Sequence, residues 1–157
     1  MSAQVIDLTA ARQQLSEHKS LRRLSADILR LAELCPDSPA EDPSGEEQLQ
    51  RWIVDLQDLL GQLEVSLKDH FAAEEASDMY TPNHPEFGRF QRDLEGLLAE
   101  HPKMLGDVAK LCAETNPKSV KPLIADTLAL VETLKAHEAA ENDILQAAYG
   151  DDLGDGD

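Results

Sequence analysis

LKDHFAAEE at residues 67–75 and LKAHEAAEN at residues 134–142 are the two segments that most constrain the structure of this chain. In both, a leucine is followed by a histidine three residues later and by a glutamate four residues after that. Side chains three and four residues apart lie on the same face of an α-helix. Each segment therefore predicts a helix whose apolar stripe ends in a His-x-x-x-Glu pair aimed at one point in the core.

The apolar stripes continue beyond these segments, and two further parts of the chain carry similar stripes. Turn-rich segments separate the four predicted helices, which cover residues 7–34, 44–78, 85–113 and 119–149. Ser44 and Glu47 form the pattern of a capping box, and Gly150 ends the last helix. Four amphipathic helices with short loops predict an all-α, antiparallel up-down-up-down four-helix bundle. We expect one domain over residues 1–150 and a disordered acidic tail over residues 151–157.

Each predicted helix carries one histidine on its inward face, and the four are His18, His70, His101 and His137. On the second and fourth helices, a glutamate follows the histidine by four residues, at Glu74 and Glu141. On the third helix, the predicted inward stripe consists of Phe87, Leu94, Leu97, His101, Leu105 and Val108. Four imidazoles and two carboxylates are therefore expected inside the bundle.

Such a set of buried polar groups needs compensation, because an unpaired buried carboxylate costs roughly several kcal/mol. Glu–His⁺ pairs would supply part of it. Two iron ions bridged by the carboxylates would do so more completely, since imidazole nitrogen and carboxylate oxygen are suitable iron ligands. The absence of thiolate from the set argues against a structural zinc site.

Charge and composition exclude several classes of function. The formal net charge of −17 repels phosphate backbones and anionic lipid head groups, so we expect no nucleic-acid partner and no membrane partner. The N-terminal segment lacks the apolar region of a secretory signal, and no apolar run is long enough to span a membrane. These features predict a cytoplasmic protein with free thiols at Cys35 and Cys112.

The histidine-bearing segments resemble those of the hemerythrin-like, or HHE cation-binding, domain family. They are LSEHKSLRRL, LKDHFAAEEASDMY, LLAEHPKML and LKAHEAAENDIL, one on each predicted helix and in the family's order. The resemblance implies a hemerythrin-like bundle with two non-haem iron ions, bridging oxygen species, and dioxygen or another small diatomic or peroxide ligand. By the same resemblance, Glu74 and Glu141 bridge the irons, and the full ligand set is His18, His70, Glu74, His101, His137 and Glu141.

The sequence departs from the family's oxygen carriers on two helices. Their third helix supplies two histidines four residues apart, whereas here Leu97 and Leu105 stand at that spacing from His101. Their last helix uses an aspartate five residues after the histidine, and this chain has Asn142 there, next to Glu141. The pattern is more similar to the family's sensor-type sites, so we do not expect stable reversible oxygen carriage.

We also have expectations for four residues outside the predicted ligand set. Glu75 and Asn142 can hydrogen-bond to the ligands, but we expect them to be solvated residues on the helix faces. His84 lies in a predicted loop, where we expect a surface or capping role. Pro102 lacks an amide hydrogen, so we expect a local distortion of the third helix, with two shorter helices as the alternative.

Three functions remain open at this point. The first is a module that binds or senses dioxygen, iron or a related small molecule at a di-iron site. The second is a di-iron enzyme that reduces peroxide or handles nitric oxide. Ferritin-type chemistry is disfavoured, because leucine stands where each Glu-x-x-His pair would need its glutamate. The third is a metal-free helical interaction module in which the histidines pair with glutamates.

Overall fold

The computed structural model describes residues 8–36, 43–80, 85–114 and 120–150 of the chain. The expectations for His84 and for the acidic tail therefore lie outside the described residues. The described residues contain no strand, which confirms the predicted all-α class. None of the described helices combines the length and the apolarity that crossing a membrane requires.

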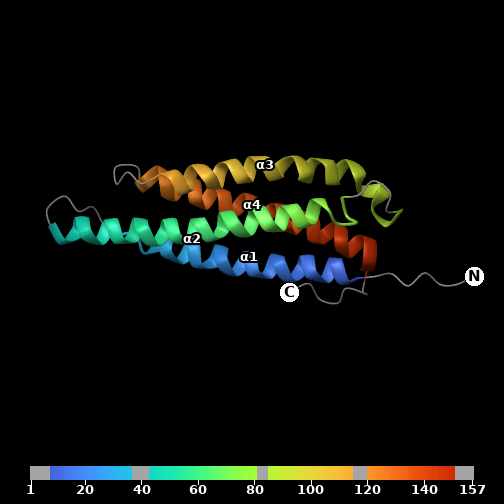
Figure 1. Ribbon diagram of the computed structural model, residues 1–157, viewed down its shortest axis with the longest axis horizontal. Coiled ribbons are helices and arrows are strands. Elements are labelled where there is room, and N and C mark those ends of the chain that lie inside the picture. The colour runs from blue at the N-terminus through green and yellow to red at the C-terminus, as the bar shows by residue number, and fades with distance from the viewer. Residues whose placement is uncertain (1–7, 37–42, 81–84, 115–119, 151–157) are drawn as a thin grey trace, which may run out of the picture.

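Within these residues, four long helices alternate in direction (Figure 1). They are α1 (Thr9–Glu33), α2 (Pro43–Glu75), α3 (Gln91–Ala113) and α4 (Val120–Tyr149), and the short 3₁₀ helix η1 (Pro85–Phe90) precedes α3. The packed pairs are α1 with α2, α2 with α3, α3 with α4, and α1 with α4. Each long helix therefore contacts two neighbours, and the predicted antiparallel four-helix bundle is confirmed.

The helix α2 ends three residues earlier than predicted. After Glu75 the chain forms a series of turns that continues to Tyr80. The hydroxyl of Ser77 donates to the Glu74 carbonyl oxygen at 2.5 Å, and the Ser77 amide donates to the same oxygen at 2.9 Å. Because these local bonds occupy the Glu74 carbonyl, the regular helical pattern stops there.

Apolar side chains of the described residues pack in two clusters. The larger cluster includes Ile28, Leu60 and Val108, and the smaller one includes Leu15 and Leu94. On α1, α3 and α4, the inward histidine lies between residues of the larger cluster and residues of the smaller one. On α2, His70 lies near the end of the helix, next to Phe71 of the larger cluster. The buried histidines therefore form a polar layer between two apolar parts of the core.

Pro102 lies inside α3, which runs without interruption through it, so the alternative of two shorter helices is wrong. Pro102 is on the exposed face of the helix, where water can bond the carbonyl that loses its helical partner. The predicted inward stripe of α3 also needs one correction. Met104 is fully buried, whereas Leu105 is only partly buried and packs against the larger cluster.

Candidate metal centre

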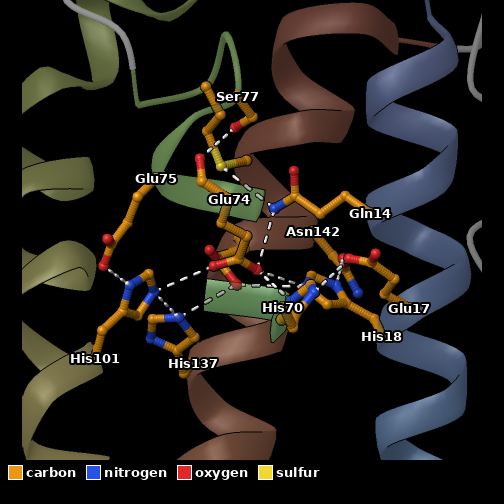
Figure 2. A network of polar contacts seen from close by, with 12 residues as sticks. Gln14, Glu17, His18, His70, Glu74, Glu75, Ser77, His101, His137 and Asn142 are labelled. Atoms are coloured by element: carbon orange, nitrogen blue, oxygen red, sulfur yellow. Dashed lines mark hydrogen bonds and ion pairs between the residues drawn. The ribbon is translucent and has the colours of Figure 1, made fainter. Parts of the chain in front are cut away.

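The six predicted ligands come together inside the bundle, and Figure 2 shows part of this network. Each long helix supplies one histidine, and α2 and α4 each add a glutamate one turn further along. None of the six is more than 4% exposed. The helical spacing of the sequence thus brings four imidazoles and two carboxylates to one depth of the core, as expected.

The six residues divide into two overlapping groups. The first contains His18 and His70 with both glutamates, and the second contains His101 and His137 with the same glutamates. Within each group, one potential ligand atom per residue lies within 4.8 Å of the others. We call the two histidine pairs half-site 1 (His18, His70) and half-site 2 (His101, His137). Each half-site takes its histidines from two consecutive long helices and shares the carboxylates with the other.

Glu74 contacts both half-sites. Its Oε1 lies 3.2 Å from Nε2 of His18 and also pairs with Nε2 of His70, while its Oε2 lies 3.1 Å from Nε2 of His101. In Figure 2 this carboxylate lies between the His18–His70 side and the His101–His137 side. One carboxylate therefore links the two half-sites through different oxygens.

Glu141 contacts both half-sites through a single oxygen. Its Oε1 lies 3.3 Å from Nε2 of His18 and 3.2 Å from Nε2 of His137. Within half-site 2, the Nε2 atoms of His101 and His137 are 3.2 Å apart. Two nitrogens that are each about 2.1 Å from one metal ion lie about 3 Å apart, so this spacing suits two ligands of the same ion.

Every histidine directs Nε2 toward the glutamates and bonds an outer oxygen through Nδ1. The four acceptors, which we call the outer acceptors, are Glu17 for His70 at 2.6 Å, Glu75 for His101 at 3.0 Å, Glu100 for His137 at 2.6 Å and Asn142 for His18 at 2.8 Å. A carboxylate or amide oxygen can only accept, so Nδ1 carries the hydrogen. This arrangement leaves Nε2 of a neutral ring available as a metal ligand.

The outer acceptors connect the helices in one direction around the bundle. Glu17 of α1 bonds the histidine of α2, Glu75 of α2 bonds that of α3, Glu100 of α3 bonds that of α4, and Asn142 of α4 bonds that of α1. Each outer acceptor is next in sequence to a predicted ligand of its own helix. The expectation that Glu75 and Asn142 are merely solvated is therefore wrong, and the roles of Glu17 and Glu100 were not predicted.

The sequence analysis also did not predict the roles of three buried or partly buried residues beside the centre. Gln14 lies one turn before His18, and its Nε2 is 3.4 Å from Oε1 of Glu74. The hydroxyl of Tyr80 donates to Oε2 of Glu141 at 2.5 Å. Glu138 is 3% exposed, and burial raises its pKa to about 7. Only Gln14 carried a usable sequence signal, because its spacing of four from His18 places it on the inward face.

The electrostatics of the centre favour charged partners. Burial alone would lower the pKa of His18, but its contacts with the carboxylates of Glu141 and Glu74 raise it to about 10. Burial would raise the pKa of Glu74, whereas its contacts with His101, His18 and His70 lower it below its usual range. The contacts with glutamates also raise the pKa of His70 and of His137 against the effect of burial. Without a metal ion, protons on these rings therefore balance the charge of the carboxylates.

Three atoms at the middle of the centre nevertheless make no hydrogen bond within the described part of the chain. They are Nε2 of His70, Oε2 of Glu74 and Oε1 of Glu141. Each lies close to a group of opposite charge, but with a geometry that does not direct a hydrogen to the acceptor. Lone pairs that converge in this way fit a bound cation, and nitrogen and oxygen donors without sulfur suit iron.

Phe71 supports the ring orientation in half-site 2. Its ring stacks on that of His101 with centroids 3.9 Å apart and an angle of 7° between the planes. The contact, together with the bond from Nδ1 to Glu75, fixes the plane of His101. The nitrogen that faces the glutamates is thus held in place before any ligand binds.

The sequence profile of the hemerythrin HHE cation-binding domain matches residues 9–149, from the first residue of α1 to the last residue of α4. The comparisons with curated proteins and with solved structures returned no match.

Proposed function

The chain belongs to the hemerythrin HHE cation-binding domain family, and we propose that it binds two non-haem iron ions in the centre described above. The ligands in this proposal are His18, His70, Glu74, His101, His137 and Glu141. The observation that carries it is the pair of half-sites, each with two imidazoles, that share two buried carboxylates. The three unbonded atoms at the middle of the centre support the same conclusion.

The division of the histidines into two half-sites supports two ions rather than one. Each half-site offers two nitrogens, and the two shared glutamates offer oxygens to both. This gives each ion about four protein ligands, whereas non-haem iron sites that react with small molecules keep open positions beyond those that the protein fills. The bound iron would supply an open coordination position for dioxygen or a related diatomic or peroxide ligand.

The function proposed for the protein is to bind or sense such a small molecule, or iron itself. Residues around the centre orient its histidine rings and exclude water from it. The outer acceptors hold the hydrogen of each ring on Nδ1, so that Nε2 faces inward. The two apolar clusters beside the polar layer exclude bulk water from it.

Metal analysis of the protein loaded with iron under anaerobic conditions tests this proposal. We expect two iron ions per chain in the wild type and, after exposure to air, absorption bands of an oxo-bridged pair. Glu141→Gln should lose iron, while Glu132→Gln, an exposed change on the same helix, should not. A wild-type protein that binds less than one iron ion, and whose melting temperature does not respond to chelators, would favour the metal-free interaction module instead.

A further inference from the structure

The two shared carboxylates are held in different ways. Glu74 meets half-site 1 through Oε1 and half-site 2 through Oε2. Glu141 meets both half-sites through Oε1, at 3.3 Å from His18 and 3.2 Å from His137. If both residues ligate the same pair of ions, Glu74 is set to bridge with two oxygens and Glu141 with one.

Tyr80 bonds the second oxygen of Glu141. Its hydroxyl donates to Oε2 of Glu141 at 2.5 Å, so this oxygen already carries a strong hydrogen bond. Glu141 is fully buried, and Oε1 makes no hydrogen bond among the described residues. The only oxygen of Glu141 without a hydrogen-bond donor is therefore the one that faces both histidines.

The backbone and the ring of Tyr80 are both held in position. Tyr80 lies in the turns after α2, where its amide donates to the Ser77 carbonyl oxygen at 3.2 Å. Its ring meets the ring of His101 edge-on, with centroids 5.8 Å apart. The phenol thus reaches Glu141 of α4 from the end of α2 and lies beside half-site 2.

We propose that Tyr80 is a positioning residue that restricts Glu141 to a single-oxygen bridge between the two iron ions. The inference rests on the proposed iron centre and adds a specific asymmetry to it. Two ions that share one oxygen atom lie closer together than two ions held by the separate oxygens of a carboxylate. Tyr80 would therefore set the distance between the ions without ligating either of them.

Tyr80→Phe removes the hydroxyl and keeps the ring beside His101. The chain contains two tyrosines, so Tyr149→Phe is a matched control, because Tyr149 packs against Phe87 in the smaller cluster. X-ray absorption spectroscopy of the iron-loaded proteins measures the distance between the ions. We expect Tyr80→Phe to keep two iron ions and to lengthen this distance, and Tyr149→Phe to leave it unchanged.

A second measurement needs no variant. Infrared spectra of the wild type with isotope-labelled glutamate report carboxylate stretching frequencies, which differ between one-oxygen and two-oxygen bridges. We expect iron loading to produce both kinds of band. If only the two-oxygen kind appears, the inference is wrong even if Tyr80→Phe fails to fold.

Other outcomes separate this inference from the proposed function. Two bound iron ions with an unchanged distance in Tyr80→Phe would overturn the role of Tyr80 and leave the iron centre intact. A visible phenolate-to-iron absorption band that Tyr80→Phe removes would show that Tyr80 is a ligand, which also overturns the inference. A wild type that binds no iron would overturn both proposals.

Discussion

His18 determines much of the proton balance of the centre. Its Nε2 lies within 3.3 Å of carboxylate oxygens of both Glu74 and Glu141, and its pKa is raised to about 10. At neutral pH the metal-free protein therefore carries a proton on this ring. A metal ion binds only the unprotonated nitrogen, so binding must release that proton.

We therefore predict that the apparent affinity for Fe²⁺ or Co²⁺ rises between pH 7 and pH 9, by up to about tenfold per pH unit for each proton displaced. Calorimetry in buffers with different ionisation enthalpies counts the released protons. At least one proton should leave per chain. Binding that is independent of pH over this range would contradict the raised pKa of His18.

Glu138 lowers the stability of the metal-free protein as the pH rises. Burial raises its pKa from 4.5 to about 7, and Oε1 has no hydrogen-bond partner in the described residues. The folded protein keeps this proton up to about pH 7, while the unfolded chain loses it near pH 4.5. As the pH rises through this window, the unfolded state binds fewer protons than the folded state, so the carboxyl group lowers stability.

Glu138→Gln removes the ionisable group and should stabilise the metal-free protein. We predict a gain of at most about 3 kcal/mol in the free energy of unfolding at pH 8, and little gain near pH 4.5. Urea unfolding of the metal-free proteins at both pH values measures it. Glu132→Gln, which changes an exposed residue of the same helix, should have no comparable effect.

The convergence of the six predicted ligands could be predicted from the sequence because a strict helical spacing fixes which side of a helix each residue occupies. Glu138 lies one step around α4 from His137, where spacing alone does not separate buried from exposed positions. Tyr80 lies beyond the regular part of α2, where no periodic pattern applies. Its contact with Glu141 depends on the path of the turns, which the sequence does not specify.

Each long helix contributes both a predicted ligand and an outer acceptor, at adjacent positions of its sequence. Adjacent residues point about 100° apart around an α-helix. One side chain can therefore face the centre while its neighbour faces the histidine of the adjacent helix. The same short segment of helix thus supplies an inner group and its neighbour's hydrogen-bond acceptor.

Removing an outer acceptor should weaken metal binding without removing a ligand. We predict that Glu100→Ala lowers the metal affinity by about 10- to 100-fold, because His137 loses the bond that orients its ring. Glu100→Gln keeps an acceptor oxygen and should recover part of the loss. Glu95→Ala, an exposed change on the same helix, is the control, and competition with a chelator of known affinity provides the measurement.

The helices themselves were predicted more closely than their ends. All four follow from the apolar stripes, but the sequence did not show that η1 precedes α3 or that α2 stops at Glu75. The sequence predicted Leu105 in the core, but the buried residue is Met104. Because an α-helix has 3.6 residues per turn, the positions three and four residues after His101 both lie close to its inward face. Packing against α2 and α4 selects between them.

The polar layer divides the core of the whole bundle, so the stability of the metal-free protein depends on the proton-mediated pairs within it. A metal ion that binds only the folded state adds RT ln(1 + [M]/Kd), which is about 2.7 kcal/mol when the free metal concentration is 100 times Kd. We predict that chelation lowers the melting temperature of the loaded wild type. Circular dichroism measures the shift, and a His18→Ala/His101→Ala double variant should show none.

In an antiparallel four-helix bundle, the second helix can lie to the left or to the right of the first. The outer acceptors make this choice unequal. Their bonds run in a single rotational sense, from each helix to the next and from α4 back to α1. In a bundle of opposite handedness, all four would point away from the histidines that they now bond. The four outer acceptors therefore contribute to selecting the handedness of the bundle.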